Sequence, residues 1–181
     1  MDACNPKTGE SISRSEYEPV GFSVVIPSLN QSKFISEAIN SLLDQKYEDL
    51  EIIVIDGGSS DGTVNILKGY GRKIRWISEE DNGQSDALVK GFAMATKEWL
   101  TWLNSDDVQT NNALHHVCAA IKGNTGVQIV VGQGHYIDER GNFLRSYPTI
   151  DANPDVDVSR QLFEKGYMAQ PSVYFLSLIH I

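Results

Sequence analysis

The sequence predicts an α/β/α sandwich built on a mostly parallel β-sheet, for three reasons. Short apolar runs alternate along the chain with segments in which apolar residues recur at helical spacing. The run Ile52–Ile55 is apolar at every position, which is typical of a parallel strand covered on both faces. The length of 181 residues suits one domain with a tail, and a hydrophobic content of 41% can supply its core.

The first strand is predicted at Phe22–Ile26, because this apolar run stops at Pro27, which cannot donate to a strand ladder. A polar turn, Ser28–Gln31, separates it from a predicted helix, and Ser32 is placed to cap that helix. The helix is indicated by six apolar residues at helical spacing: Phe34, Ile35, Ala38, Ile39, Leu42 and Leu43.

The second unit repeats this order. Leu50–Ile55 is predicted as a strand, Asp56–Gly62 as a loop and Thr63–Lys68 as a short helix. Lys73–Ile77 is the third predicted strand, and Glu79–Gly83 is the turn after it.

The alternation then continues to a hairpin. A helix with Ala87, Leu88, Phe92 and Ala95 on its inward face precedes the fourth strand, Trp99–Leu103. The later elements are a helix that buries Leu114, Val117, Cys118 and Ile121, a fifth strand at Val127–Val131, and a hairpin of Tyr136–Asp138 with Phe143–Arg145.

Charge and composition exclude several classes of function. The 24 acidic residues outnumber the 15 basic ones, which gives a net charge of −9 and argues against nucleic-acid binding. A phosphorylated ligand would then need a divalent cation to neutralise it. Residues 1–20 form a polar leader that we expect to be flexible, and no apolar run is long enough to span a membrane. With only Cys4 and Cys118, a cytoplasmic protein is expected.

The loops after the first, second and fourth strands should converge on one crevice, because open parallel sheets bind ligands outside the carboxyl ends of their strands. The first loop offers Ser28 and Asn30 after Pro27, although taken alone this pattern is better explained as an ordinary turn. In the second loop, Asp56 directly follows a buried strand, and its carboxylate could accept a hydrogen bond from the ring N–H of a nucleobase. The alternative is that Ser60 or Asp61 only caps the next helix.

The third loop, Asn104–Asp107, carries the strongest signal for a metal. Asp106 and Asp107 would repel each other by up to about 4 kcal/mol at about 4 Å unless a cation lies beside them. Oxygen ligands favour Mg²⁺ or Mn²⁺, which takes the rest of its coordination from phosphates and water. The alternative is that Asp107 points toward the next helix and only Asp106 serves the site.

The combination of motifs is more specific than any single one. The chain contains, in order, VVIPSLN, SLLDQKY, LEIIVIDGGSSDGT, DNGQSDALVKGFAMAT and WLTWLNSDD. Over Gly21–Phe175 this series resembles the family 2 glycosyltransferases, which have the GT-A fold, a Rossmann-like α/β/α sandwich. The resemblance divides the chain into the leader 1–20, a nucleotide-sugar-binding glycosyltransferase domain at 21–175, and a tail at 176–181 without a family match.

The resemblance implies transfer of a sugar, with inversion, from a nucleoside diphosphate sugar to an acceptor hydroxyl. It favours a UDP-sugar donor, a saccharide or lipid-linked acceptor, a role in polysaccharide or glycoconjugate synthesis, and a place in the cytoplasm or at the inner face of the membrane. The metal, Mg²⁺ or Mn²⁺, is assigned to Asp106 and Asp107. The donor-binding residues that it implies are Pro27, Ser28, Asn30, Asp56, Gly83, Asp86, Asn104 and Ser105.

The chain departs from the family pattern at three places. Asn104 replaces the customary first aspartate of an Asp-x-Asp motif, and Val89 stands where many members carry asparagine. The family continues past the QPSVYF strand with a carboxylate that acts as the catalytic base. Because Leu176–Ile181 does not match that segment, we expect the reading frame to be truncated here and the base to lie beyond Phe175.

Three alternative functions make different demands on the sequence. A nucleotide-sugar-binding fragment without transferase activity would bind the donor but form no product. A phosphoacceptor receiver domain needs an acidic pair after the first strand, where this chain has Pro27 and Ser28. A nucleotidyltransferase normally has a basic glycine-rich loop at that place, which this sequence lacks.

Overall fold

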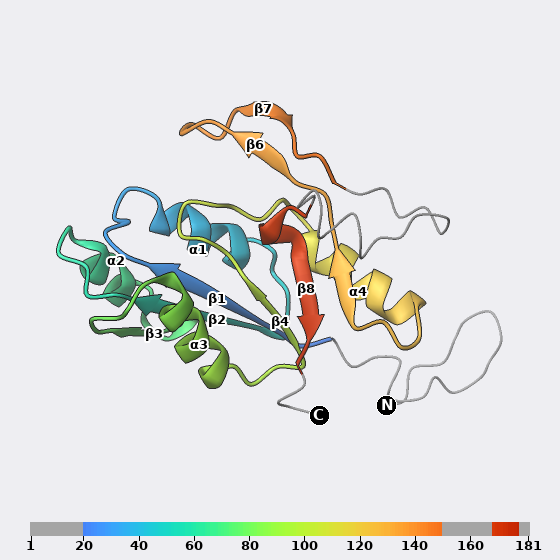
Figure 1. Cartoon of the computed structure of the whole chain (residues 1–181), viewed down its shortest axis with the longest axis horizontal. Helices are drawn as coiled ribbons and strands as arrows, with labels where there is room; N and C mark the ends of the chain where they lie inside the picture. Colours follow the sequence, from blue (N-terminus) through green and yellow to red (C-terminus); the bar gives the residue numbers. More distant parts are fainter. Residues whose placement is uncertain (1–19, 150–167, 178–181) are drawn as a thin grey trace.

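The structure, a computed structural model, describes residues 20–149 and 168–177 (Figure 1). Nearly all of the predicted leader, and the tail after Ser177, lie outside the described residues. The strands are β1 (Phe22–Ser28), β2 (Leu50–Asp56), β3 (Arg75–Ser78), β4 (Trp99–Trp102), β5 (Ile129–Val131), β6 (His135–Ile137), β7 (Phe143–Ser146) and β8 (Val173–Leu176). The helices are α1 (Ile35–Leu43), α2 (Thr63–Gly69), α3 (Gln84–Met94) and α4 (Ala113–Gly123), with short 3₁₀ turns at Gly71–Lys73 and Gln170–Ser172.

Six strands form one sheet in the order β3-β2-β1-β4-β8-β5. β1 pairs in parallel with β2 and β4, and β2 pairs in parallel with β3. β8 runs antiparallel between β4 and β5. The predicted mostly parallel sheet is therefore confirmed, and the chain after the hairpin returns to separate the fifth strand from the fourth.

The two faces of the sheet bury alternate residues of the same strands. On one face Val24 and Ile26 of β1 pack with α1 and α2, and on the other Val25 packs with α3. This alternation follows from the two-residue period of a strand. Phe22 and Trp99, the first residues of β1 and β4, pack with Leu114 of α4. The sheet is thus covered on both faces, as its apolar strands require.

The sequence predicted that the first strand stops at Pro27, and this prediction was wrong. Its register with β2 continues through Pro27 and Ser28, which lies opposite Asp56. The ladder with β4 ends at Val25, so β1 needs donors only toward β2 beyond that point, and the chain tolerates proline there.

Two further predictions about local structure were wrong, while the hairpin was confirmed. Ser32 does not cap α1, because the helix begins at Ile35 without a side-chain cap and the Ser32 N–H donates to Asp61 Oδ2 at 2.9 Å. The third strand begins only at Arg75, after a 3₁₀ turn. β6 and β7 pair antiparallel and extend away from the sheet in Figure 1.

No helix within the described residues is long and apolar enough to cross a membrane.

Candidate functional site

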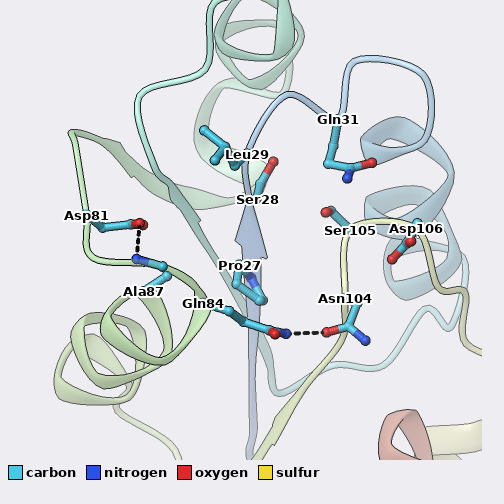
Figure 2. Close-up of a pocket in the computed structure, with 11 residues that line it drawn as sticks. Pro27, Ser28, Leu29, Gln31, Asp81, Gln84, Ala87, Asn104, Ser105 and Asp106 are labelled. Atoms are coloured by element: carbon cyan, nitrogen blue, oxygen red, sulfur yellow. Dashed lines mark hydrogen bonds between the residues drawn. The ribbon is translucent and has the colours of Figure 1, made fainter.

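A cleft of about 290 Å³ opens at the carboxyl ends of β1 and β4, beside the start of α3 (Figure 2). The loops after β1 and β4 both line it, as expected for an open parallel sheet. Its lining residues are Pro27, Ser28, Leu29, Gln31, Asp81, Gly83, Gln84, Ala87, Asn104, Ser105 and Asp106.

Ser28 presents an unpaired hydroxyl in this cleft. The residue is 6% exposed, and its Oγ is the one buried side-chain oxygen or nitrogen within residues 20–149 and 168–177 that lacks a hydrogen-bond partner. Leaving such a group unpaired costs about 1–3 kcal/mol. A ligand with a polar group at this position would remove that cost.

Asn30 joins the first two loops and does not line the cleft. Its N–H donates to Ser59 Oγ at 2.7 Å, and its Oδ1 accepts from the Ser60 N–H at 2.9 Å. Its φ of +54° is one that asparagine tolerates better than most residues. Asn30 therefore fixes the loop after β1 against the loop after β2.

Asp56 is completely buried, and its carboxylate is occupied by nearby groups. Oδ2 accepts from the N–H groups of Gly58 and Ser59, at 3.2 and 2.9 Å, and from Ser78 Oγ at 2.6 Å. Oδ1 accepts from Ser59 Oγ. Asp56 thus organises the loop after β2, and it is absent from the lining of the cleft.

The amino terminus of α3 faces the cleft through Gly83. This residue has φ +103° and ψ −177°, a region essentially restricted to glycine, and no side chain caps the helix. Open N–H groups at a helix start favour a negatively charged ligand. Asp86 instead accepts from the Asn82 N–H at 3.1 Å and lies 3.6 Å from Lys90 Nζ. The hydrogen bond from Asn82 is the main cause that lowers the pKa of Asp86.

Asn104 is the junction of a polar network at the end of β4. Its Oδ1 accepts from Gln84 Nε2 at 2.7 Å, and its Nδ2 donates to Asp107 Oδ2 at 2.9 Å and Gln170 Oε1 at 3.1 Å. Asn104 also lines two neighbouring cavities, of about 340 and 300 Å³. An ionised aspartate at this position could not make the two donations.

Asp106 and Asp107 face different cavities. Asp106 is exposed and lines the cleft, whereas Asp107 lines the 340 Å³ cavity. Burial is the main cause that raises the pKa of Asp107. The described residues contain no group of three or more His, Cys, Asp or Glu able to hold a metal. Asp106 alone still suits Mg²⁺ or Mn²⁺, since such ions often take one or two protein carboxylates together with substrate phosphates.

The structure brings together part of the predicted site. Of the predicted residues, six line the cleft: Pro27, Ser28, Gly83, Asn104, Ser105 and Asp106. Four do not: Asn30, Asp56, Asp86 and Asp107. The roles of both groups stay predictions. A base beyond Phe175 falls on residues of which only Leu176 and Ser177 are described, and neither is a carboxylate.

The cleft is also lined by Gln31, Asp81 and Gln84, which were not predicted from the sequence. Each stands in a predicted turn or directly after one, so position relative to the strand ends was the available signal. The lining contains no Lys, Arg or His, and a diphosphate bound here would therefore need an added cation.

The family profile described as Glycosyl transferase family 2 matches residues 23–176. A similar protein is an uncharacterized glycosyltransferase of Rickettsia conorii, 37% identical over 126 residues, a match that covers 68% of this chain and 21% of that protein. Glycosyltransferase GlyG of Streptococcus pneumoniae is 29% identical over 126 residues, or 67% of this chain and 42% of GlyG. The chain thus spans less than half the length of these relatives.

Among solved structures, residues 1–349 of S. aureus TarS in complex with UDP-GlcNAc match with a TM-score of 0.67 and 22% identity, covering 87% of this chain and 45% of that one. The mannosyltransferase PcManGT of Pyrobaculum calidifontis, in complex with GDP-Man and Mn²⁺, matches with a TM-score of 0.55 and 22% identity over 64% of this chain and 36% of that one. These likenesses show the GT-A fold. Because the family profile covers most of the sequence, the chain belongs to glycosyl transferase family 2.

Proposed function

We propose that the cleft binds a nucleoside diphosphate sugar and that the sugar is transferred, with inversion, to an acceptor hydroxyl in polysaccharide or glycoconjugate synthesis. The observation that carries this proposal is the buried, unpaired Ser28 hydroxyl in a cleft of a family 2 glycosyltransferase. A buried polar atom that lacks a protein partner marks a place where a ligand group fits.

The diphosphate is assigned to the side of the cleft formed by Asp106 and the start of α3. The open N–H groups after Gly83 favour an anion, and Asp106 is the carboxylate that would hold Mg²⁺ or Mn²⁺. A bound divalent cation would supply the positive charge that stabilises a leaving diphosphate. The Gln84–Asn104 hydrogen bond links the start of α3 to the loop after β4. It would thereby position the open N–H groups of the helix and the Asp106 carboxylate for the same ligand.

The acceptor is assigned to the neighbouring 340 Å³ cavity, which meets the donor cleft at Asn104. Tyr136 and Tyr147 line this cavity with their rings 5.3 Å apart in a stacked arrangement. Aromatic faces and scattered polar groups suit a saccharide or lipid-linked acceptor. Attack from this side, opposite the leaving diphosphate, would invert the anomeric centre.

Two solved relatives support the choice of donor. TarS is described in complex with UDP-GlcNAc, and PcManGT in complex with GDP-Man and Mn²⁺. We therefore propose a nucleoside diphosphate sugar as the donor class here, with a UDP-sugar favoured, and Mg²⁺ or Mn²⁺ as the cofactor.

Calorimetry with UDP and GDP, with and without Mn²⁺, tests this function. Binding should require Mn²⁺, and Asp106→Asn should weaken it, while the matched variant Asp44→Asn at the exposed end of α1 should bind as the unchanged protein does. Equal affinity after chelation would remove the metal from the proposal. Binding of the donor sugar without acceptor-dependent release of nucleoside diphosphate would favour a binding role over transfer.

A further inference from the structure

Three cavities meet at Asn104. This residue lines the donor cleft of about 290 Å³, the neighbouring cavity of about 340 Å³ and a third cavity of about 300 Å³. Gln84 lines the donor cleft and the third cavity, whereas Gln170 lines the second and the third. Gln170 therefore lies outside the donor cleft and is connected to it by the side chain of Asn104.

Three side-chain amides form a chain of hydrogen bonds across this point. Gln84 Nε2 donates to Asn104 Oδ1 at 2.7 Å, and Asn104 Nδ2 donates to Gln170 Oε1 at 3.1 Å. Gln170 Nε2 donates in turn to the carbonyl oxygen of Trp102 in β4 at 2.7 Å. A backbone carbonyl can only accept, so this last bond decides that the Gln170 oxygen is the end left for Asn104. Figure 2 shows the first bond of the chain, between Gln84 and Asn104.

The turn that carries Gln170 is held on both sides. Gln170 begins the 3₁₀ turn that leads into β8, and Ala169 before it is 4% exposed. The Ser172 N–H donates to the Ala169 carbonyl at 2.9 Å, and the Ser172 carbonyl accepts from the Gly132 N–H at 2.9 Å. These bonds fix the backbone of the turn, so the Gln170 side chain can serve as a firm support for Asn104.

The two acceptors of Asn104 Nδ2 differ in where they come from. Asp107 Oδ2, at 2.9 Å, belongs to the same loop, three positions further along the chain. Gln170 Oε1 comes from a segment 66 residues away. The bond to Asp107 thus shapes the loop itself, whereas the bond to Gln170 ties that loop to the turn before β8.

We propose, resting on the proposed donor function, that Gln170 is a positioning residue for donor binding. It acts through Asn104, which it holds in the wall of the donor cleft, and through Asn104 on Gln84 at the start of α3, where the diphosphate is assigned. Because Gln170 also lines the cavity assigned to the acceptor, it joins the two halves of the site.

The experiment measures the affinity of the full chain for UDP and GDP, in the presence of Mn²⁺, in a double-mutant cycle of Gln170→Met and Asn104→Ala. Methionine has a similar length to glutamine but lacks the amide. Gln170→Met should weaken binding of the preferred nucleotide by about three- to tenfold, the effect of losing one neutral hydrogen bond. In the Asn104→Ala background the same substitution should change the affinity by about twofold or less, because the residue through which it acts is gone.

Urea unfolding of the same variants separates positioning from a structural role. Gln170→Met also removes the bond to Trp102, so it should lower the urea midpoint in both backgrounds. The control is Gln45→Met, at a buried glutamine whose Nε2 donates to the carbonyls of Ser41 and Thr110 and which lines none of the three cavities. This variant should lower the midpoint and leave the nucleotide affinity unchanged.

Two results would overturn the proposal. An equal loss of affinity from Gln170→Met in both backgrounds would mean that Gln170 does not act through Asn104. An unchanged affinity in folded Gln170→Met would mean that it does not position the donor cleft. Failure of the proposed function gives a different result, because the unchanged chain would then bind neither UDP nor GDP and Gln170 would have no donor to position.

Discussion

Replacing Ser28 by alanine should make the protein more stable and a weaker ligand binder. The Ser28 hydroxyl is buried at the end of β1 with no partner, so the folded state carries a desolvation cost that the unfolded chain does not. Ser28→Ala removes that cost without deleting any hydrogen bond. Such an opposition between stability and function is common at binding sites.

The magnitude follows from the burial and the missing partner. An unpaired buried hydroxyl costs about 1–3 kcal/mol, and alanine keeps the Cβ atom at this position. We expect the free energy of unfolding to rise by about 1 kcal/mol, which corresponds to an increase of about 2–4 °C in Tm for a domain of this size. Loss of one neutral hydrogen bond should weaken UDP binding by about three- to tenfold.

A second buried serine on the same strand provides the control. Ser23 is also fully buried, but its Oγ donates to Glu51 Oε2 at 2.7 Å and accepts from the Lys97 N–H at 3.1 Å. Ser23→Ala should therefore destabilise the protein by about 1–3 kcal/mol, the opposite sign. Urea unfolding with an unchanged m-value is the assay. If Ser28→Ala destabilises the fold as Ser23→Ala does, the hydroxyl is satisfied in solution and the reasoning is refuted.

Three further outcomes are expected. Gly91→Ala should lower the free energy of unfolding in urea by about 1–3 kcal/mol, because the new Cβ would lie 2.3 Å from a valine methyl of β1. Gly69→Ala, whose Cβ would have nothing within 4 Å, should be neutral or slightly stabilising. Equal effects of the two substitutions would contradict the close packing of α3. Asn104→Asp should lower the free energy of unfolding more at pH 8 than at pH 5. At pH 8 the new carboxylate and that of Asp107 are both ionised and repel each other, and protonation at lower pH relieves the repulsion. An effect that does not change with pH would contradict this explanation. The pKa of Asp61 is lowered, first by a hydrogen bond from a threonine hydroxyl, so the stabilisation of the fold by Asp61 is present above its ordinary pKa of 3.8 and is lost as the pH falls further. Asp61→Asn should therefore reduce the difference in unfolding free energy between pH 6 and pH 3. An unchanged difference would rule out this role for Asp61.

The parallel half of the sheet could be predicted from the sequence because its signals are local. The apolar runs of β1, β2 and β4 and the helical spacing between them fix both the elements and their alternation. The antiparallel position of β8 could not be predicted in this way, since it depends on pairing with two strands far away in the sequence. The end of β1 was also misjudged, because the effect of Pro27 depends on how far β4 extends beside it.

Among the predicted site residues, too, those with a local sequence signal were placed correctly, and those that depend on contacts with distant segments were not. Strand-end position correctly indicated that Ser28 and Asp106 would meet at one cleft. The saturation of Asp56 depends partly on Ser78, which comes from a different strand, and no pattern near Asp56 reports that contact. Adjacency in sequence suggested that Asp106 and Asp107 act together, but the turn after β4 directs them to separate cavities.

The position of β8 between β4 and β5 constrains the order in which the sheet can assemble during synthesis. β5 leaves the ribosome before β8, yet β8 is its neighbour in the sheet, and no other described strand pairs with β5. Until Val173–Leu176 emerges, the outer edge of β4 has no partner and β5 cannot dock. Chains fold from the amino terminus as they are made, so β3, β2, β1 and β4 should form an early unit with an open edge. Such an edge can pair with another chain, and nascent chains should therefore be most prone to aggregation just before β8 arrives.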